Sequence, residues 1–243
     1  MEEKTTSLKT TARLAGLLYL FWVITGIFGL IYVPSQTIVR GDAVATANKI
    51  LANEFLFRTG IINDIISITI GIFLVLVLYR LFKQVNEHQA KLMVTLLSVT
   101  FPVAFIMDAF SITSLMILKG EVLKIFEFSQ RQDLAMLFLK INDYGTIVLE
   151  MFWGLWLIPF GQLVYKSGFI PRIIGIFLIL NGIAYIIHSF TALLLPEYQT
   201  LVSQFAMPFW ILGEVSITLW LLIKGIKVQK NTITGGNFDR TLI

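Results

Sequence analysis

The chain has 243 residues, of which 56% are hydrophobic and only 14% charged, a balance far from that of soluble proteins. It contains no cysteine, which excludes disulfides, thiolate metal sites, iron–sulfur clusters and cysteine nucleophiles. Its formal net charge of +4 comes from Lys and Arg residues in short clusters between apolar runs, so we expect no nucleic-acid partner.

Six apolar runs are each long enough to cross a hydrocarbon core of roughly 30 Å as a helix. The predicted spans are residues 12–33, 57–79, 92–118, 141–165, 173–195 and 205–223. The expected fold is therefore all-α, with residues 1–230 forming a single polytopic transmembrane bundle in the lipid bilayer. The tail, residues 231–243, has no apolar periodicity and is expected to be disordered.

The first apolar run follows three basic residues and could be mistaken for a secretory signal. It is longer than the apolar core of a signal and lacks a small-residue cleavage site. We therefore interpret it as an uncleaved first span that ends at Pro34.

Two connecting segments have roughly helical spacing of apolar and charged residues. In the first, residues 42–54, Asp42 is expected to cap the N-terminus of a short helix. In the second, residues 122–128 predict either a short helix at the membrane interface or an extension of the neighbouring spans.

The apolar run of residues 134–165 would be roughly 45–50 Å long as one helix, which exceeds the hydrocarbon thickness. We expect its start to protrude and its membrane portion to begin near Asn142. Pro102, Pro159 and Pro171 are expected at kinks or helix boundaries.

The Lys and Arg residues favour a multi-pass orientation with both termini in the cytoplasm. With the N-terminus inside, 12 of the 19 basic residues face the cytoplasm and 7 face outward. The inner segments hold 12 basic against 4 acidic residues, a net charge of +8, whereas the outer segments are neutral. The cytoplasmic set is Lys4, Lys9, Arg13, Arg80, Lys83, Lys91, Lys166, Arg172, Lys224, Lys227, Lys230 and Arg240.

Five ionisable residues stand inside predicted spans, where such groups are costly unless they are protonated, paired or hydrated. They are Asp64, Asp108, Glu150, His188 and Glu214, and Asn181 adds a polar side chain to the fifth span. At a rise of 1.5 Å per residue, the five lie roughly 10–15 Å below the outer boundary. We expect them to meet in one layer around a polar cavity that opens outward.

These residues fit several roles: a proton relay, a cation site, the acid/base pair of an intramembrane hydrolase, or interhelical hydrogen bonds. No HExxH, GxSxG or glycine-rich phosphate loop is present, so we assign no catalytic residue. With two histidines far apart in sequence, we expect no metal site and no cofactor.

The leading hypothesis is a non-enzymatic membrane protein that binds or passes a small molecule, ion or proton. A hydrolase or metal-dependent enzyme and a structural or regulatory subunit remain alternatives, and a homo-oligomer is left open.

Residues 154–175, GLWLIPFGQLVYKSGFIPRIIG, form the most distinctive motif of the chain. Together with ARLAGLLY at residues 12–19 and LFR at residues 56–58, they resemble the domain of unknown function 4386 family over residues 10–225. The resemblance implies a six-helix bacterial membrane protein and brings no catalytic residues with it. The motif also fits the end of the fourth span, a tight turn at residues 166–168, and a fifth span that starts after Pro171.

Overall fold

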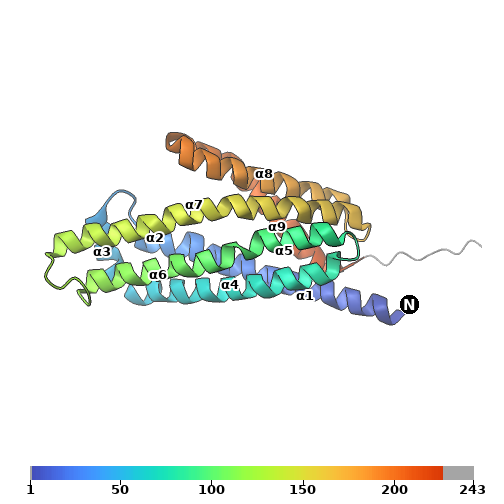
Figure 1. The fold of residues 1–243 in the computed structure, drawn as a ribbon, viewed down its shortest axis with the longest axis horizontal. Helices are drawn as coiled ribbons and strands as arrows, with labels where there is room; N and C mark the ends of the chain where they lie inside the picture. Colours follow the sequence, from blue (N-terminus) through green and yellow to red (C-terminus); the bar gives the residue numbers. More distant parts are fainter. Residues whose placement is uncertain (1, 227–243) are drawn as a thin grey trace, which may run out of the picture.

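The computed structural model describes residues 2–226, with side chains from residue 8 onward, and the predicted disordered tail lies outside this range. The described part is all-α (Figure 1). Its helices are α1 (Glu2–Ile27), the π-helix η1 (Phe28–Tyr32), α2 (Val33–Thr37), α3 (Ala43–Ala52), α4 (Glu54–Phe82), α5 (Glu87–Ser98), α6 (Thr100–Lys119), α7 (Phe128–Ser167), α8 (Arg172–Leu194), the 3₁₀-helix η2 (Pro196–Tyr198), α9 (Gln199–Leu219) and the π-helix η3 (Trp220–Lys224).

Six continuous helical segments of the described chain are long and apolar enough to cross a membrane. They are Leu8–Thr37, Glu54–Phe82, Glu87–Lys119, Phe128–Ser167, Arg172–Leu194 and Pro196–Lys224. The predicted all-α class with six spans is therefore confirmed. Because the number of spans is even, the N-terminus and the end of α9 lie at the same end of the bundle (Figure 1).

The first span does not end at Pro34 as predicted. Its helix widens into the π-turn η1, in which the amide of Val33 donates to the carbonyl of Phe28, and continues to Thr37. Proline has no amide hydrogen and its ring crowds the preceding helical turn. The wider turn directly before Pro34 accommodates the ring, so the helix bulges where the sequence suggested a stop.

The other prolines behave in two ways. Pro102 lies at the start of α6, four residues after Ser98, the last residue of α5. Since Pro102 has no amide hydrogen to donate to the Ser98 carbonyl, the third span divides between α5 and α6. Pro171 is the N-cap of α8 and directly precedes its first residue. These two predicted boundaries are confirmed, whereas Pro159 lies inside the uninterrupted α7.

The connection between α6 and α7 corrects the expectation of an interfacial helix. Gly120 ends α6 in the left-handed conformation, with φ of 70°, and residues 121–127 are non-helical. Glu127 then starts α7 through a capping box with Gln130. Two short-range signals, a glycine stop and a capping start, thus outweigh the helical spacing of the apolar residues between them. The predicted cap of α3 is confirmed, because Asp42 accepts a 2.8 Å hydrogen bond from the amide of Ala45.

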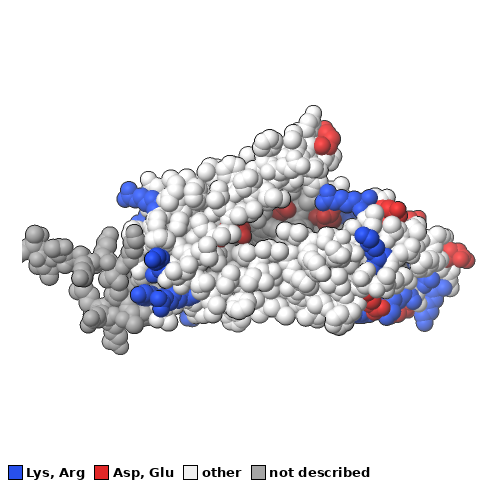
Figure 2. All heavy atoms as spheres, turned by 180° about the vertical axis from the view of Figure 1, so that it is seen from behind, with Lys and Arg blue, Asp and Glu red and all other residues white. Residues whose placement is uncertain are grey.

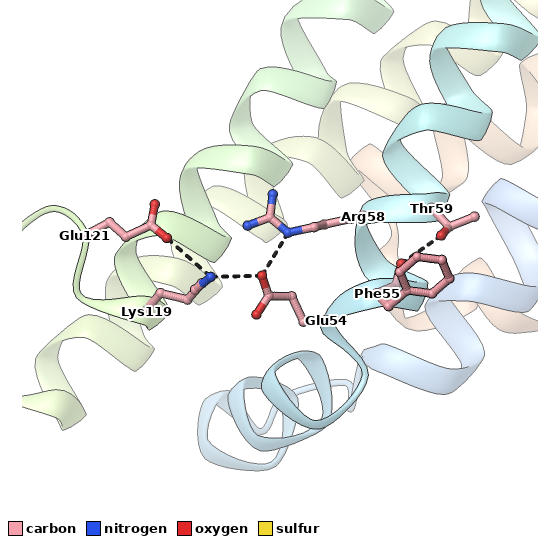
Figure 3. A network of polar contacts seen from close by, with 6 residues as sticks. All are labelled: Glu54, Phe55, Arg58, Thr59, Lys119 and Glu121. Atoms are coloured by element: carbon pink, nitrogen blue, oxygen red, sulfur yellow. Dashed lines mark hydrogen bonds and ion pairs between the residues drawn. The ribbon is translucent and has the colours of Figure 1, made fainter.

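Salt bridges join the start of α4 to the end of α6 (Figure 3). Glu54 accepts from Arg58 at 2.8 Å and from Lys119 at 3.0 Å, and Lys119 also reaches Glu121 at 3.4 Å. These side chains are about one third to one half exposed, so solvent screens the pairs and their contribution to stability is small.

Helices α7 and α8 make the most extensive helix–helix contact of the described residues, and two glycine pairs face one another there. A Cβ built on Gly161 would lie 2.6 Å from the carbonyl oxygen of Gly175, and the reverse is equally true. Seven residues further along each helix, Gly154 and Gly182 make the same reciprocal contact. Because neither pair leaves room for a side chain, the two backbones touch along two turns.

Replacing Gly161 with alanine is expected to destabilise the protein by about 1–3 kcal/mol, because the added methyl must push α7 and α8 apart. The matched control is Gly26→Ala in α1, where a Cβ would meet nothing within 4 Å. Thermal unfolding of the purified variants in detergent measures the difference. Equal midpoints for Gly161→Ala and wild type would contradict the backbone contact.

Candidate functional site

The contact between α7 and α8 brings two of the predicted site residues together. His188 Nδ1 and Glu150 Oε2 are 2.6 Å apart, and their side chains are only 7% and 15% exposed. At this distance a proton must lie between the two atoms. One helical position away, the Ser189 hydroxyl donates to the carbonyl of Ile147 at 2.7 Å, which fixes the register of the two helices.

Helix α9 adds the third ionisable group to this side of the bundle. The carboxylate of Glu214 lies beside Asn181 and Tyr185 of α8. Gly213 allows this approach, since a Cβ there would lie 2.7 Å from the amide nitrogen of Asn181. Asn181 is fully buried, and neither polar atom of its amide completes a hydrogen bond.

Two tyrosines extend the cluster toward the centre of the bundle. Tyr185 lies close enough to both Glu150 and Glu214 for the two carboxylates to act on its hydroxyl. Tyr19 of α1 is fully buried, its hydroxyl has no hydrogen-bond partner, and it faces Glu214 and Tyr185. A buried tyrosine hydroxyl usually finds a partner, so this group is aimed at a polar site.

Aromatic rings surround the same carboxylates. Tyr185 stacks on Trp210 of α9 with ring centres 5.0 Å apart, and Trp153 of α7 meets Tyr185 edge-on at 6.1 Å. Trp210 also meets His188 edge-on at 5.3 Å. All three rings are half-buried. They therefore form a partly accessible aromatic layer one helical turn from the acids.

Asp64 and Asp108 form a second group, on α4 and α6, close enough for their carboxylates to repel one another. Asp64 packs over Gly29 of the π-turn, at a point where a Cβ would clash with its carboxylate. The neighbouring Asn63 donates to the Thr25 carbonyl at 2.9 Å and to Asp64 at 3.3 Å. Asp108 is 8% exposed, and its Oδ2 atom has no hydrogen-bond partner.

The six predicted site residues thus occur as two sets of direct neighbours, and the common layer remains a prediction. Glu150, His188, Glu214 and Asn181 come together on α7–α9, and Asp64 pairs with Asp108. In the middle of the molecule Figure 2 shows acidic side chains at the bottom of a hollow in an otherwise uncharged surface. Among the described residues, no group of three or more His, Asp or Glu is arranged to hold a metal ion.

The sequence prediction did not include Tyr19, Trp153 and Trp210 in the site. It assigned the tryptophans to packing or interface anchoring, and they do pack on Tyr185. Their spacing along the sequence could have indicated them. Trp153 follows Glu150 by three residues and Trp210 precedes Glu214 by four, so each tryptophan shares a helix face with its acid. Tyr19 gave no such signal.

The Glu150–His188 contact predicts energetic coupling between the two side chains. Glu150→Gln and His188→Gln are each expected to destabilise the protein, and the double variant to lose less than the sum, with a coupling of about 0.5–3 kcal/mol. Unfolding of all four proteins in detergent measures the cycle. Additive losses would show that the side chains do not interact. Glu197→Gln, an exposed acid of η2, is the control.

Comparison with known proteins places this arrangement in a family. The model of the family described as "Domain of unknown function (DUF4386)" matches residues 14–225. The chain is also similar to an uncharacterised protein of Archaeoglobus fulgidus, with 33% identity over 93 residues, 38% of this chain and 51% of the relative. The match thus spans about half the length of that relative, and no solved structure matches the chain. Because the family model covers most of its length, the chain belongs to the domain of unknown function 4386 family.

Proposed function

We propose that the protein is a multi-pass component of the bacterial cytoplasmic membrane whose polar cluster on α7–α9 binds or passes a small molecule, ion or proton. The cluster is defined as Glu150, His188, Glu214, Asn181 and Tyr185. Residues 1–230 act as a single membrane bundle with both termini in the cytoplasm.

Charge distribution supports this orientation. On the face in Figure 2, Lys and Arg lie at both ends of the molecule, but Asp and Glu accompany them at one end only. On this face, the end without visible acids is the end at which α1 begins and η3 finishes. Acidic residues weigh little in the orientation rule, so the orientation itself rests on the Lys and Arg residues, of which 12 would face the cytoplasm and 7 the outside.

One observation carries the functional part of the proposal. The fully buried amide of Asn181 stands in the middle of an apolar helix and acts on the Glu214 carboxylate, but the two groups are too far apart to complete a hydrogen bond. Leaving buried polar atoms unpaired costs about 1–3 kcal/mol each, and a helix contact made of leucine would avoid that cost. A ligand or transferred proton that pairs with these atoms accounts for their presence.

A purely structural role is the second candidate, and the Glu150–His188 contact favours it. A short, nearly buried contact between α7 and α8 holds helices together whether or not a ligand binds. Asp64 and Asp108 lie outside the α7–α9 cluster. We propose that they form a second pair in the polar interior and accept protons.

The orientation predicts which surface positions a membrane-impermeant thiol reagent reaches. The chain has no cysteine, so the reagent can label only the single cysteine that each variant introduces. Ser129→Cys, exposed near the start of α7, is expected to react in intact cells, and Gln84→Cys, exposed between α4 and α5, only after permeabilisation. The reverse pattern would show that the termini face outward.

A binding role predicts that a ligand stabilises the wild-type protein through the cluster. The measurement is the thermal midpoint in detergent across pH 5–8 with inorganic cations, organic cations, organic anions and lipids. At least one member of the panel is expected to raise the midpoint, and Glu214→Gln to abolish that rise while Glu197→Gln retains it. If no member stabilises wild type and every cluster variant only melts earlier, the cluster is structural.

A further inference from the structure

We infer that the ligand of the α7–α9 cluster is an organic cation with apolar or aromatic substituents, an inference that rests on the proposed function and names its ligand class. Charge, ring geometry and access each restrict the ligand.

Charge restricts the sign of the ligand. Residues 14–39, 59–79, 92–118, 141–165 and 173–223 contain no Lys or Arg. The acids of the cluster, Glu150 and Glu214, therefore have only His188 as a cationic partner within the spans, and His188 is already engaged with Glu150. Glu214 faces two neutral groups, the Asn181 amide and the Tyr185 hydroxyl. A bound cation would balance Glu214, whereas an anion would be repelled by it.

Aromatic rings restrict the kind of cation. A small inorganic cation is held by several oxygen atoms at short range, and carboxylates or carbonyls then crowd the site. Here the carboxylates stand among rings instead: Trp153 and Tyr185 meet at 82°, and Trp210 stacks on Tyr185. Rings and carboxylates together are the environment that recognises substituted ammonium and related ions, through the ring faces and through apolar contact.

Access to the cluster restricts the shape of the ligand. In Figure 1 the end of α8 diverges from the start of α7, and Figure 2 shows the hollow with acidic side chains on the opposite face. On α9, the helix that carries Glu214, the apolar side chains of Phe205, Met207 and Ile211 are more than half exposed. A ligand that reaches Glu214 along such surfaces needs apolar substituents around its charge.

The test uses the purified full-length protein in detergent and the ion pair tetraphenylphosphonium and tetraphenylborate, which share size and shape but differ in charge. Tetraphenylphosphonium is expected to bind in equilibrium dialysis and to raise the thermal midpoint, and tetraphenylborate to do neither. Glu214→Gln is expected to abolish binding, and Trp210→Leu to weaken it about tenfold. The matched controls are Glu197→Gln, an exposed acid, and Phe73→Leu, which removes an exposed ring from α4.

The outcomes distinguish a wrong ligand class from a wrong proposed function. Equal binding of tetraphenylphosphonium to Glu214→Gln, Trp210→Leu and the controls would indicate partition into the detergent and overturn the inference. Stabilisation by sodium or protons through Glu214, without any effect of tetraphenylphosphonium, would also overturn it while leaving the proposed function intact. Where Trp210→Leu does not purify folded, Trp153→Leu removes a ring from the facing helix and gives the same test.

Discussion

The contact between the backbones of α7 and α8 is the constraint on which the candidate site depends. Two reciprocal glycine pairs, seven residues apart on each helix, let the helices touch without intervening side chains. Only at that separation can Glu150 and His188 meet at 2.6 Å and Ser189 reach the carbonyl of Ile147. Gly213 has the same role on α9, where it brings Glu214 against Asn181. The glycines, which have no side chains, are therefore as necessary for bringing the site together as the polar residues themselves.

Electrostatics then decides what such a site can hold. The apolar stretches that carry the four intramembrane acids, Asp64, Asp108, Glu150 and Glu214, contain no Lys or Arg and a single histidine, His188. An acid in the hydrocarbon region must be protonated, paired with a cation or hydrated. In each case its charge state depends on a proton, an ion or water that the protein takes up. Because acids outnumber cationic side chains in the spans, a ligand bound there is expected to carry positive charge.

The sequence predicts the overall fold well, because the fold depends on strong one-dimensional signals. Apolar runs of sufficient length identify the six spans, and Asp42 marks the start of α3. Prediction fails where two local signals compete. Pro34 indicates a stop, but the preceding π-turn absorbs its ring, and the apolar spacing of residues 122–128 suggests a helix that Gly120 and Glu127 exclude.

For the site, the sequence identifies costly residues but not their partners. An ionisable residue inside an apolar run can be recognised from the sequence of one span, so all five were named as candidates. Their division into two groups depends on which helices are neighbours, and that follows from the glycine contacts of α7 and from Gly29, where Asp64 packs. Tyr19 lies on the distant α1 and could be placed beside Glu214 only by the tertiary structure.

The central claim, that His188 forms a short, enclosed contact with Glu150, can be tested most directly by NMR of the protein labelled with ¹⁵N-histidine. The chain has only two histidines, and His88 is exposed, so a His88→Gln variant assigns both signals. The structure predicts that the His188 ring nitrogens are protected from solvent and shift when Glu150 is replaced with Gln, while those of His88 do not. A His188 signal that exchanges with solvent like that of His88, with no response to Glu150→Gln, would contradict the account.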